Sequence, residues 1–285
     1  MKKVILLFAI VTVGLLSPKA SAQTIVDNAF VDGLFVEQAT GRNKPMPMPT
    51  VREADVMWQK RIWREIDFRQ KINQGFYYPV TPHQNWKNFI TIILDGLKEG
   101  RIQAYEISET DELTTPISYK NIMDGLTGSH TEVFLDENGY EVTKTISDDF
   151  YPTSVQRLRI MEEWYFDKQR SQLMVRILAL CPVMNVEKDD GEGGVRVGTK
   201  PMFWIPFDSA REVLSESYYF NRNNGAMKLT YDEVFWKRMF DSYIYKEENV
   251  YDRSIQDYAQ GINAMLESER IKQSIVDFEQ YLWDY

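Results

Sequence analysis

Apolar residues between Thr50 and Asn73 recur at the spacing of an amphipathic helix. At about 100° per residue they fall on one broad side; they are Ala54, Met57, Trp58, Ile62, Ile66 and Ile72. Thr50 and Glu53 have the form of a capping box, which satisfies backbone N–H groups where a helix starts. The pattern therefore predicts a helix over residues 50–73. Trp63 falls on the other side, so the helix is either buried on two sides or presents Trp63 to another subunit.

The last part of the chain has two apolar stripes and predicts a helix over residues 253–283. The first stripe has the 4, 3, 4 spacing of a coiled-coil seam and consists of Ile271, Ile275, Phe278 and Leu282. The second lies roughly opposite and consists of Ile262, Met265, Leu266, Val276 and Trp283. Both apolar faces of such a helix are expected to be buried. In a monomer, further core residues of the same chain would bury the second face, and in an assembly the surface of a neighbouring subunit would bury it.

The middle of the chain favours β-strands. Asn138-Gly139 separates two short apolar runs and predicts a hairpin over residues 133–142. Further strands are expected over 102–107, 158–168, 173–186 and 201–207, with helices over 85–98 and 208–215. Thr230 and Glu233 form a second capping box before a short helix.

These elements predict an α+β fold of residues 50–285, in which central antiparallel strands are flanked by N-terminal and C-terminal helices. The run from Val56 to Trp63 is echoed, one residue shorter, by Val234 to Phe240. The echo suggests two related halves with a boundary near residues 125–150.

Residues 1–22 have the form of a secretory signal peptide. Lys2 and Lys3 precede an apolar run, and Ala20-Ser21-Ala22 is a small-residue cleavage site. The run has only 13 apolar residues, from Val4 to Leu16, too few to span a membrane as a helix. Because no Cys follows it, the chain is not expected to be a lipoprotein. We expect a soluble, exported protein that begins at Gln23.

Residues 23–49 are expected to form an extended arm. Prolines alternate in its last part, and each fixes φ and removes a backbone donor. Apolar residues on both sides of the prolines favour an arm that lies on a partner over a solvated linker. The arm residues expected to bind a partner are Phe30, Phe35, Pro45, Met46, Pro47 and Met48. Trp63, Ile271, Ile275, Phe278 and Leu282 complete the set of candidate contact residues.

Composition narrows the possible chemistry. The chain has 15 Phe, 16 Tyr and 7 Trp, but one Cys and two His among 285 residues. One Cys excludes an internal disulfide and a Cys-based zinc site. The net charge of −9 becomes −12 once the three lysines of residues 1–22 are removed, which disfavours nucleic acid as a partner. No nucleotide-binding loop or nucleophile elbow is present, so we expect no cofactor, no metal and no catalytic residue.

Several candidate sites have simpler explanations. His83 and His130 lie in polar, turn-like contexts and are expected at the surface. Glu162 and Glu163 suggest a glycosidase pair, but neighbouring strand residues point to opposite faces. Cys181 lies in an apolar run and is expected to be a buried, protected thiol.

Long tryptophan-bearing strings resemble the GldN family, also called PorN. They are residues 55–73 (DVMWQKRIWREIDFRQKIN), 77–79 (YYP), 233–240 (EVFWKRMF), 243–246 (YIYK) and 249–255 (NVYDRSI), with the end of the chain through Trp283. The resemblance spans nearly all of the mature chain.

The resemblance implies a component of the Bacteroidota type IX secretion and gliding machinery. It implies a periplasmic subunit, without enzymatic activity, that forms a ring with the lipoprotein GldK (PorK) under the outer membrane. It also implies contact with the periplasmic part of the motor-linked protein GldM (PorM). The alternatives are a secreted enzyme acting on polysaccharide, which would place paired carboxylates in an aromatic-lined cleft, and a monomeric carbohydrate-binding module.

Overall fold

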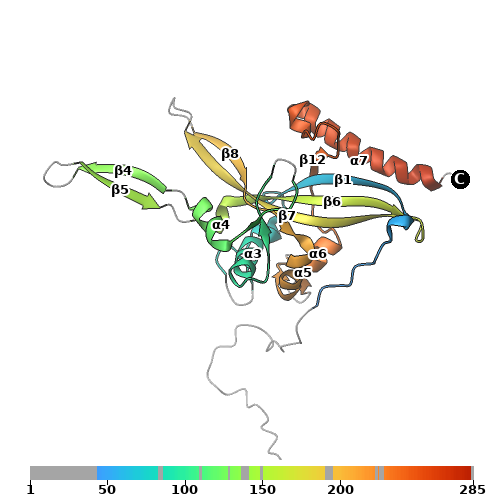
Figure 1. The fold of residues 1–285 in the computed structure, drawn as a ribbon, viewed down its shortest axis with the longest axis horizontal. Helices are drawn as coiled ribbons and strands as arrows, with labels where there is room; N and C mark the ends of the chain where they lie inside the picture. The colour runs from blue at the N-terminus through green and yellow to red at the C-terminus, as the bar shows by residue number, and fades with distance from the viewer. Residues whose placement is uncertain are drawn as a thin grey trace, which may run out of the picture. The chain divides into compact units, whose positions relative to one another are not determined.

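The computed structural model describes residues 44–82, 86–108, 111–127, 129–135, 141–147, 150–189, 195–221, 224 and 228–283 (Figure 1). The chain divides into two compact units, residues 1–41 and 42–285. The first unit lies outside the described residues, as do the expected signal peptide and the arm residues Phe30 and Phe35.

An antiparallel sheet organises the second unit. Its strands follow the order β12-β1-β6-β7-β8, and the short strand β9 also pairs with β7. The strands are β1 (Val56–Asp67), β6 (Val155–Asp167), β7 (Gln172–Asp189), β8 (Val195–Pro201), β9 (Ile205–Pro206) and β12 (Tyr243–Glu247). The α+β class and the paired central strands expected from the sequence are therefore confirmed.

The helix predicted over residues 50–73 is wrong, because this segment forms β1. The strand pairs antiparallel with β6 and β12 and is nearly buried from Ile62 to Ile66. Both faces are buried there, and the buried stretch includes the charged Arg64 and Glu65, so the apolar–polar alternation of a half-exposed strand is absent and the remaining apolar spacing can be mistaken for that of a helix. Val, Ile and Trp also favour strands. The expected capping box at Thr50 and Glu53 does not start a helix. Glu53–Asp55 form one 3-10 turn, η1, whose N-cap residue is Arg52, and no side chain caps it.

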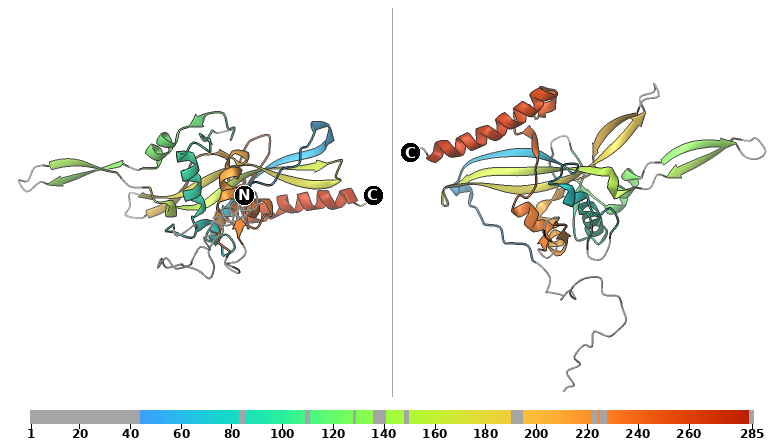
Figure 2. Two further views of the ribbon diagram at one scale, coloured as in Figure 1. Left: turned by 90° about the horizontal axis from the view of Figure 1, so that it is seen from below. Right: turned by 180° about the vertical axis from the view of Figure 1, so that it is seen from behind.

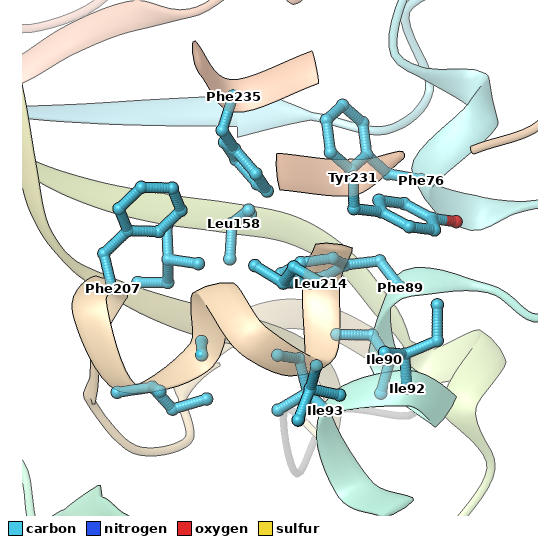
Figure 3. Packing of buried hydrophobic residues seen from close by; sticks show 14 of the residues in the cluster. Phe76, Phe89, Ile90, Ile92, Ile93, Leu158, Phe207, Leu214, Tyr231 and Phe235 are labelled. Atoms are coloured by element: carbon cyan, nitrogen blue, oxygen red, sulfur yellow. The ribbon is translucent and has the colours of Figure 1, made fainter. Parts of the chain in front are cut away.

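The main hydrophobic core lies between the sheet and a group of helices (Figure 3). The helices are α2 (Gln74–Tyr77), α3 (Phe89–Lys98), α4 (Tyr119–Leu126), α5 (Phe207–Glu216) and α6 (Tyr231–Trp236). Phe76 lies at the centre of an aromatic cluster, with its ring centroid within 6.0 Å of those of Phe68, Phe89, Tyr219, Tyr231 and Phe235. These rings stabilise the core through burial and edge contacts.

Side-chain caps begin three of these helices, and in α4 Ser118 Oγ accepts the Asn121 N–H at 3.3 Å. Asn88 Oδ1 accepts the Thr91 N–H at 2.8 Å, and Thr230 Oγ1 accepts the Glu233 N–H at 3.2 Å. The predicted helix over 85–98 is confirmed, although it starts at Phe89, and so is the Thr230 cap of α6. The helix expected from Asp208 is α5 and starts one residue earlier.

Three short two-stranded sheets complete the described fold. They are β2 (Ala104–Tyr105) with β3 (Pro116–Ile117), β4 (Ser129–Leu135) with β5 (Glu141–Ser147), and β10 (Tyr218–Tyr219) with β11 (Leu229–Thr230). The hairpin predicted over 133–142 is confirmed by the β4–β5 pairing, in which Val133 faces Thr143. Its turn residues, Asn138 and Gly139, lie outside the described part of the chain.

The sequence echo does not reflect a repeated structure. Val56 to Trp63 lie in a strand, whereas Val234 to Trp236 end helix α6. The predicted strand over 201–207 is also shorter than expected, because β8 ends at Pro201, β9 covers only Ile205–Pro206, and Phe207 already begins α5. Two 3-10 turns, η2 (Pro152–Ser154) and η3 (Ile255–Asp257), and the last helix, α7 (Ile262–Trp283), complete the described elements.

Candidate protein-interaction surface

The inner face of α7 packs on the sheet of its own chain. Ile271 and Ile275 are buried against Ile62 of β1 and Ile244 of β12. Phe278 stacks on Trp58 of β1 with ring centroids 4.6 Å apart. The Ile244 N–H also donates to Ser268 Oγ at 3.0 Å, so α7 satisfies a backbone donor of the edge strand β12. The coiled-coil-like stripe predicted from the sequence is therefore an intramolecular contact face.

The outer face of α7 is an uncovered apolar surface. Ile262 is 76% exposed, Met265 75% and Leu266 64%. These residues and the exposed Val276 lie about half a turn away from the inner stripe on the helix. We call these four residues the outer stripe. The second apolar face predicted from the sequence is present, and in the single chain it faces outward.

The described end of the arm lies on the helices of its own chain. Residues 44–50 carry no regular secondary structure. Arg211 of α5 donates from Nη2 to the Met46 carbonyl oxygen at 2.6 Å. The same guanidinium forms a buried ion pair with Asp232 of α6, with Nε 2.7 Å from Oδ1. Met48 packs against the main core, while Met46 is exposed.

The structure separates the predicted contact residues into three groups. Buried within the chain are Trp63, Ile271 and Ile275, while Phe278 and Leu282 are half-buried. Pro45, Met46, Pro47 and Met48 lie in the extended segment held by Arg211, and Phe30 and Phe35 lie outside the described residues. Trp63 packs with Met161, Cys181 and Trp204 in a buried cluster within its own chain. Partner binding by these residues stays a prediction.

A groove that the sequence analysis missed lies at one end of the sheet. Its volume is about 610 Å³. Its lining residues are Val51, Glu53, Val56, Met57, Trp58, Gln59, Glu163, Tyr165, Arg176 and Leu178. They come from the segment before β1 and from three strands that are distant in sequence, so no single segment carried a pattern that could reveal the groove. Met57 and Arg176 are substantially exposed there.

The acidic pair Glu162-Glu163 is not a catalytic dyad. Glu162 is fully buried and accepts from Arg238 at 2.8 Å and from the Trp164 indole at 3.0 Å. Glu163 pairs instead with Arg61 at 2.9 Å. Neighbouring strand residues point to opposite faces, so each carboxylate has its own arginine on its own side of the sheet.

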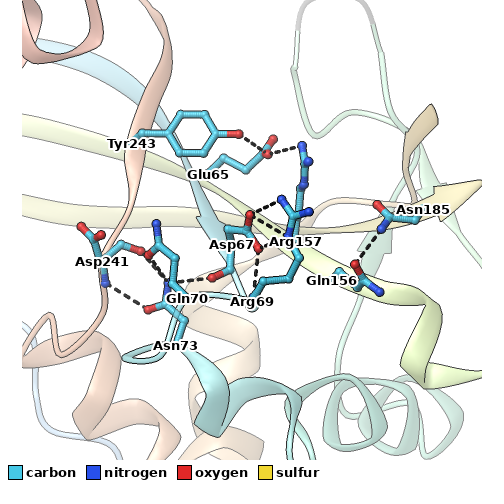
Figure 4. A network of polar contacts seen from close by, with 10 residues as sticks. All are labelled: Glu65, Asp67, Arg69, Gln70, Asn73, Gln156, Arg157, Asn185, Asp241 and Tyr243. Atoms are coloured by element: carbon cyan, nitrogen blue, oxygen red, sulfur yellow. Dashed lines mark hydrogen bonds and ion pairs between the residues drawn. The ribbon is translucent and has the colours of Figure 1, made fainter. Parts of the chain in front are cut away.

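Another buried carboxylate, Glu65, lies in a dense polar network (Figure 4). It accepts from Arg157 at 3.0 Å, from Arg159 at 3.1 Å and from the Tyr243 hydroxyl. Burial raises the pKa of Tyr243, and the adjacent Glu65 carboxylate raises it further. Two guanidinium groups and one phenol thus compensate the buried charge of Glu65, as a structural carboxylate requires.

Lys246 and Cys181 are also buried structural groups. Lys246 lies 4.5 Å from the centroid of the Trp63 ring and pairs with Asp111 at 3.0 Å and Asp252 at 2.8 Å. Burial alone would lower the pKa of Lys246, but the hydrogen bonds that its ammonium group donates to Asp252 and Asp111 raise it above its ordinary value. Burial raises the pKa of Cys181 to about 12, as expected for a protected thiol.

The described part of the chain offers neither a metal centre nor a membrane span. Within it, no group of three or more His, Cys, Asp or Glu side chains is arranged to hold a metal ion. None of the helices placed in the structure is long and apolar enough to cross a membrane. His83 lies outside the described residues, and His130 lies in β4.

Comparison with known proteins agrees with the resemblance seen in the sequence. The sequence model of the family described as gliding motility associated protein GldN matches residues 51–284. The match covers β1 through α7 and starts just after the proline-rich end of the arm. A comparison with curated proteins finds no match.

Proposed function

This chain belongs to the GldN family of gliding motility associated proteins, and from that premise we propose that it is a non-enzymatic assembly subunit of the type IX secretion and gliding machinery. In this proposal it works in the periplasm after export by residues 1–22. It forms a ring with a GldK-type lipoprotein, which holds it at the outer membrane, and it contacts the periplasmic part of a GldM-type motor-linked protein.

The observation that carries the assembly role is the outer stripe of α7. Three large aliphatic side chains, Ile262, Met265 and Leu266, are each at least 64% exposed within two turns of one helix. Contiguous exposed apolar residues mark interaction sites more often than scattered ones do. Leaving this surface uncovered costs free energy in water, and a partner protein would remove that cost.

The polar groups of the sheet support a non-enzymatic role. Among the described residues, the deeply buried carboxylates Glu65, Glu162, Asp167 and Asp232 are each neutralised by at least one arginine. Catalytic carboxylates commonly have perturbed pKa values and stand in a cleft open to substrate. Here the carboxylates join strands and helices to one another instead.

Partner binding by the arm can be tested with a truncated chain. Residues 44–50 should be kept, because Met48 packs in the core and Met46 is held by Arg211. A chain that lacks residues 24–43 should fold and melt like the full mature chain, but it should no longer co-purify with the lipoprotein from solubilised envelopes. Undiminished co-purification would remove the arm from the lipoprotein contact.

A second variant separates the arm from α7 in the same assay. Leu266→Glu places a charge on the outer stripe without disturbing the inner face of α7. If both the truncated chain and Leu266→Glu recover the lipoprotein as well as the unmodified chain, neither surface serves the proposed attachment. Hydrolysis of envelope polysaccharide by the purified chain would instead favour the enzyme alternative.

A further inference from the structure

One end of the sheet carries α7 on one face and the groove on the other. We call it the distal end; it comprises residues 56–61 of β1, 163–167 of β6 and 172–178 of β7. Lys60, Trp164 and Val175 stand opposite one another in register, as do Trp58, Phe166 and Leu173. Trp164 and Leu173 pack with Ile271 and Ile275. This set of side chains therefore points toward α7, which runs along the strands in Figure 2.

The alternate set of side chains points to the reverse face. Gln59, Tyr165 and Met174 are in register with one another, and so are Arg61, Glu163 and Arg176. Side chains alternate between faces along a strand, and residues directly opposite each other share a face. Gln59, Glu163, Tyr165 and Arg176 of this set line the groove of about 610 Å³, and Trp58 is its one lining residue from the set named above, so the groove lies mainly on the face away from α7.

We propose that the outer stripe of α7 in one chain docks into this groove on a second copy of the chain. The inference deepens the self-association in the proposed function by naming its two surfaces. The stripe is an apolar ridge made by Ile262, Met265 and Leu266, and the groove is a concave surface with Met57 and Leu178 in its lining. Its volume of about 610 Å³ lies within the range of ligand-binding clefts.

Charge also suits a second copy of the helix in this place. Glu269 and Lys272 lie beside the outer stripe and form an exposed ion pair with each other at 3.3 Å. The groove is bordered by charges of both signs, with Arg176 and Glu53 in its lining. Arg176 pairs with Asp208 at 3.2 Å, and because this pair and the Glu269–Lys272 pair are both exposed and therefore weak, Arg176 and Glu269 of a neighbour can exchange partners on docking. Complementary rim charges fix the orientation of a contact more than they strengthen it.

The placement of the two surfaces gives the contact a direction. Ridge and groove lie on opposite faces of the same sheet, so a chain that binds one neighbour through its ridge keeps its groove for another. A contact between two different surfaces is heterologous, and its repetition closes into a ring or continues as a filament. If two α7 helices packed on each other through the same surface, the contact would be isologous and association would stop at a dimer.

Two charge substitutions and their mixture test this contact. The probe is the chain from Gln23 to Tyr285, studied by analytical ultracentrifugation over a concentration series. Leu266→Glu places a charge on the ridge, and Met57→Glu places a charge in the groove. Both residues are exposed in the single chain, so neither substitution should disturb its fold. Asn263→Glu, on the side of α7, and Met239→Glu, on an exposed loop, are the matched controls. Thermal melts show whether each variant is folded.

The unmodified chain and both controls should self-associate with rising concentration. Leu266→Glu and Met57→Glu should each associate at least about tenfold more weakly, because docking would bury an unpaired carboxylate. An equimolar mixture of the two variants should form a 1:1 pair and stop there, since it has one intact ridge and one intact groove.

Each of four results would overturn the proposal. The first three are an unmodified chain that stays monomeric throughout, a Met57→Glu chain that associates normally, and a mixture that forms no pair. Loss of association on deletion of residues 24–43 would also overturn it, because the arm would then be the occupant. Self-association of the purified chain needs no lipoprotein. A chain that associates as proposed but recovers no lipoprotein from envelopes would refute the proposed function and leave the docking surfaces intact.

Discussion

The indole of Trp58 stacks on the ring of Phe278, with centroids 4.6 Å apart and an interplanar angle of 28°. The contact joins the first strand of the sheet to the last helix of the chain. It sets which face of α7 is buried, and therefore which face remains outside. An exposed apolar face on a helix that is fixed in this way is a rigid surface, which binds a partner at a lower entropic cost than a mobile segment would.

Phe278→Ala should lower the free energy of unfolding by about 2 kcal/mol, because it removes a half-buried ring and the stacking contact of that ring with Trp58. Gln280→Ala, at an exposed position on the same helix, should change it by less than about 0.5 kcal/mol. Urea denaturation followed by tryptophan fluorescence measures both. Equal stability of the two variants would show that α7 is not held by this stack.

Arg211→Met should destabilise the chain by about 3–5 kcal/mol, because it leaves the buried Asp232 carboxylate without its partner. The double variant Arg211→Met/Asp232→Leu should recover much of this loss, since it buries no unpaired charge. In both variants the Met46 carbonyl loses its donor, so limited proteolysis should cut within residues 42–50 sooner than in the unmodified chain. Unchanged cleavage would show that Arg211 does not hold the arm.

The Asp67–Arg69 contact predicts an acid-dependent contribution to stability. Burial alone would raise the pKa of Asp67, but the hydrogen bonds from Arg69 lower it below its ordinary value near ~3.9. The folded state therefore binds this proton less readily than the unfolded state does. The contribution is full above the unfolded pKa and is lost as the pH falls through the folded pKa.

Asp67→Asn should accordingly be about 1 kcal/mol less stable than the unmodified chain at pH 7, a small value because Arg69 is largely exposed. The difference should shrink below about pH 4. Urea midpoints measured from pH 3 to pH 7 give the comparison. A difference that stays constant across this range would assign the effect to something other than the charge of Asp67.

Cys181 should resist alkylation in the folded chain. With a pKa of about 12, its thiol carries almost no thiolate at pH 8.5, and the side chain is fully buried. Mass spectrometry after iodoacetamide treatment should show labelling only when urea is added. Rapid labelling of the folded chain would mean that the β6–β7 region opens readily.

Local signals predicted the elements that have a half-exposed pattern or a cap. Helix α3, the Thr230 cap of α6 and both stripes of α7 follow from the spacing of apolar residues or from a polar residue at a helix start. The β6–β7 pair follows from a partly alternating stretch and a long apolar run with a polar turn between them. Each of these signals lies within one short segment of the chain.

The strand β1 and the groove could not be predicted in this way. Ile62, Trp63, Arg64, Glu65 and Ile66 are all buried, because the chain covers both faces of β1, and this burial hides the alternation of the strand. The buried charges are compensated by partners distant in sequence, such as Arg157 for Glu65. Residues of three strands line the groove, and no local sequence pattern indicates in which register these strands pair.

If the chain works as a subunit of a larger envelope assembly, the mass of the complex recovered with a tagged chain from solubilised envelopes should show it. We expect a particle many times larger than one chain, which contains the lipoprotein and several copies of the subunit. Recovery of a single chain of about 31 kDa, obtained from 33.5 kDa by removing 22 residues of roughly 0.11 kDa each, would contradict it.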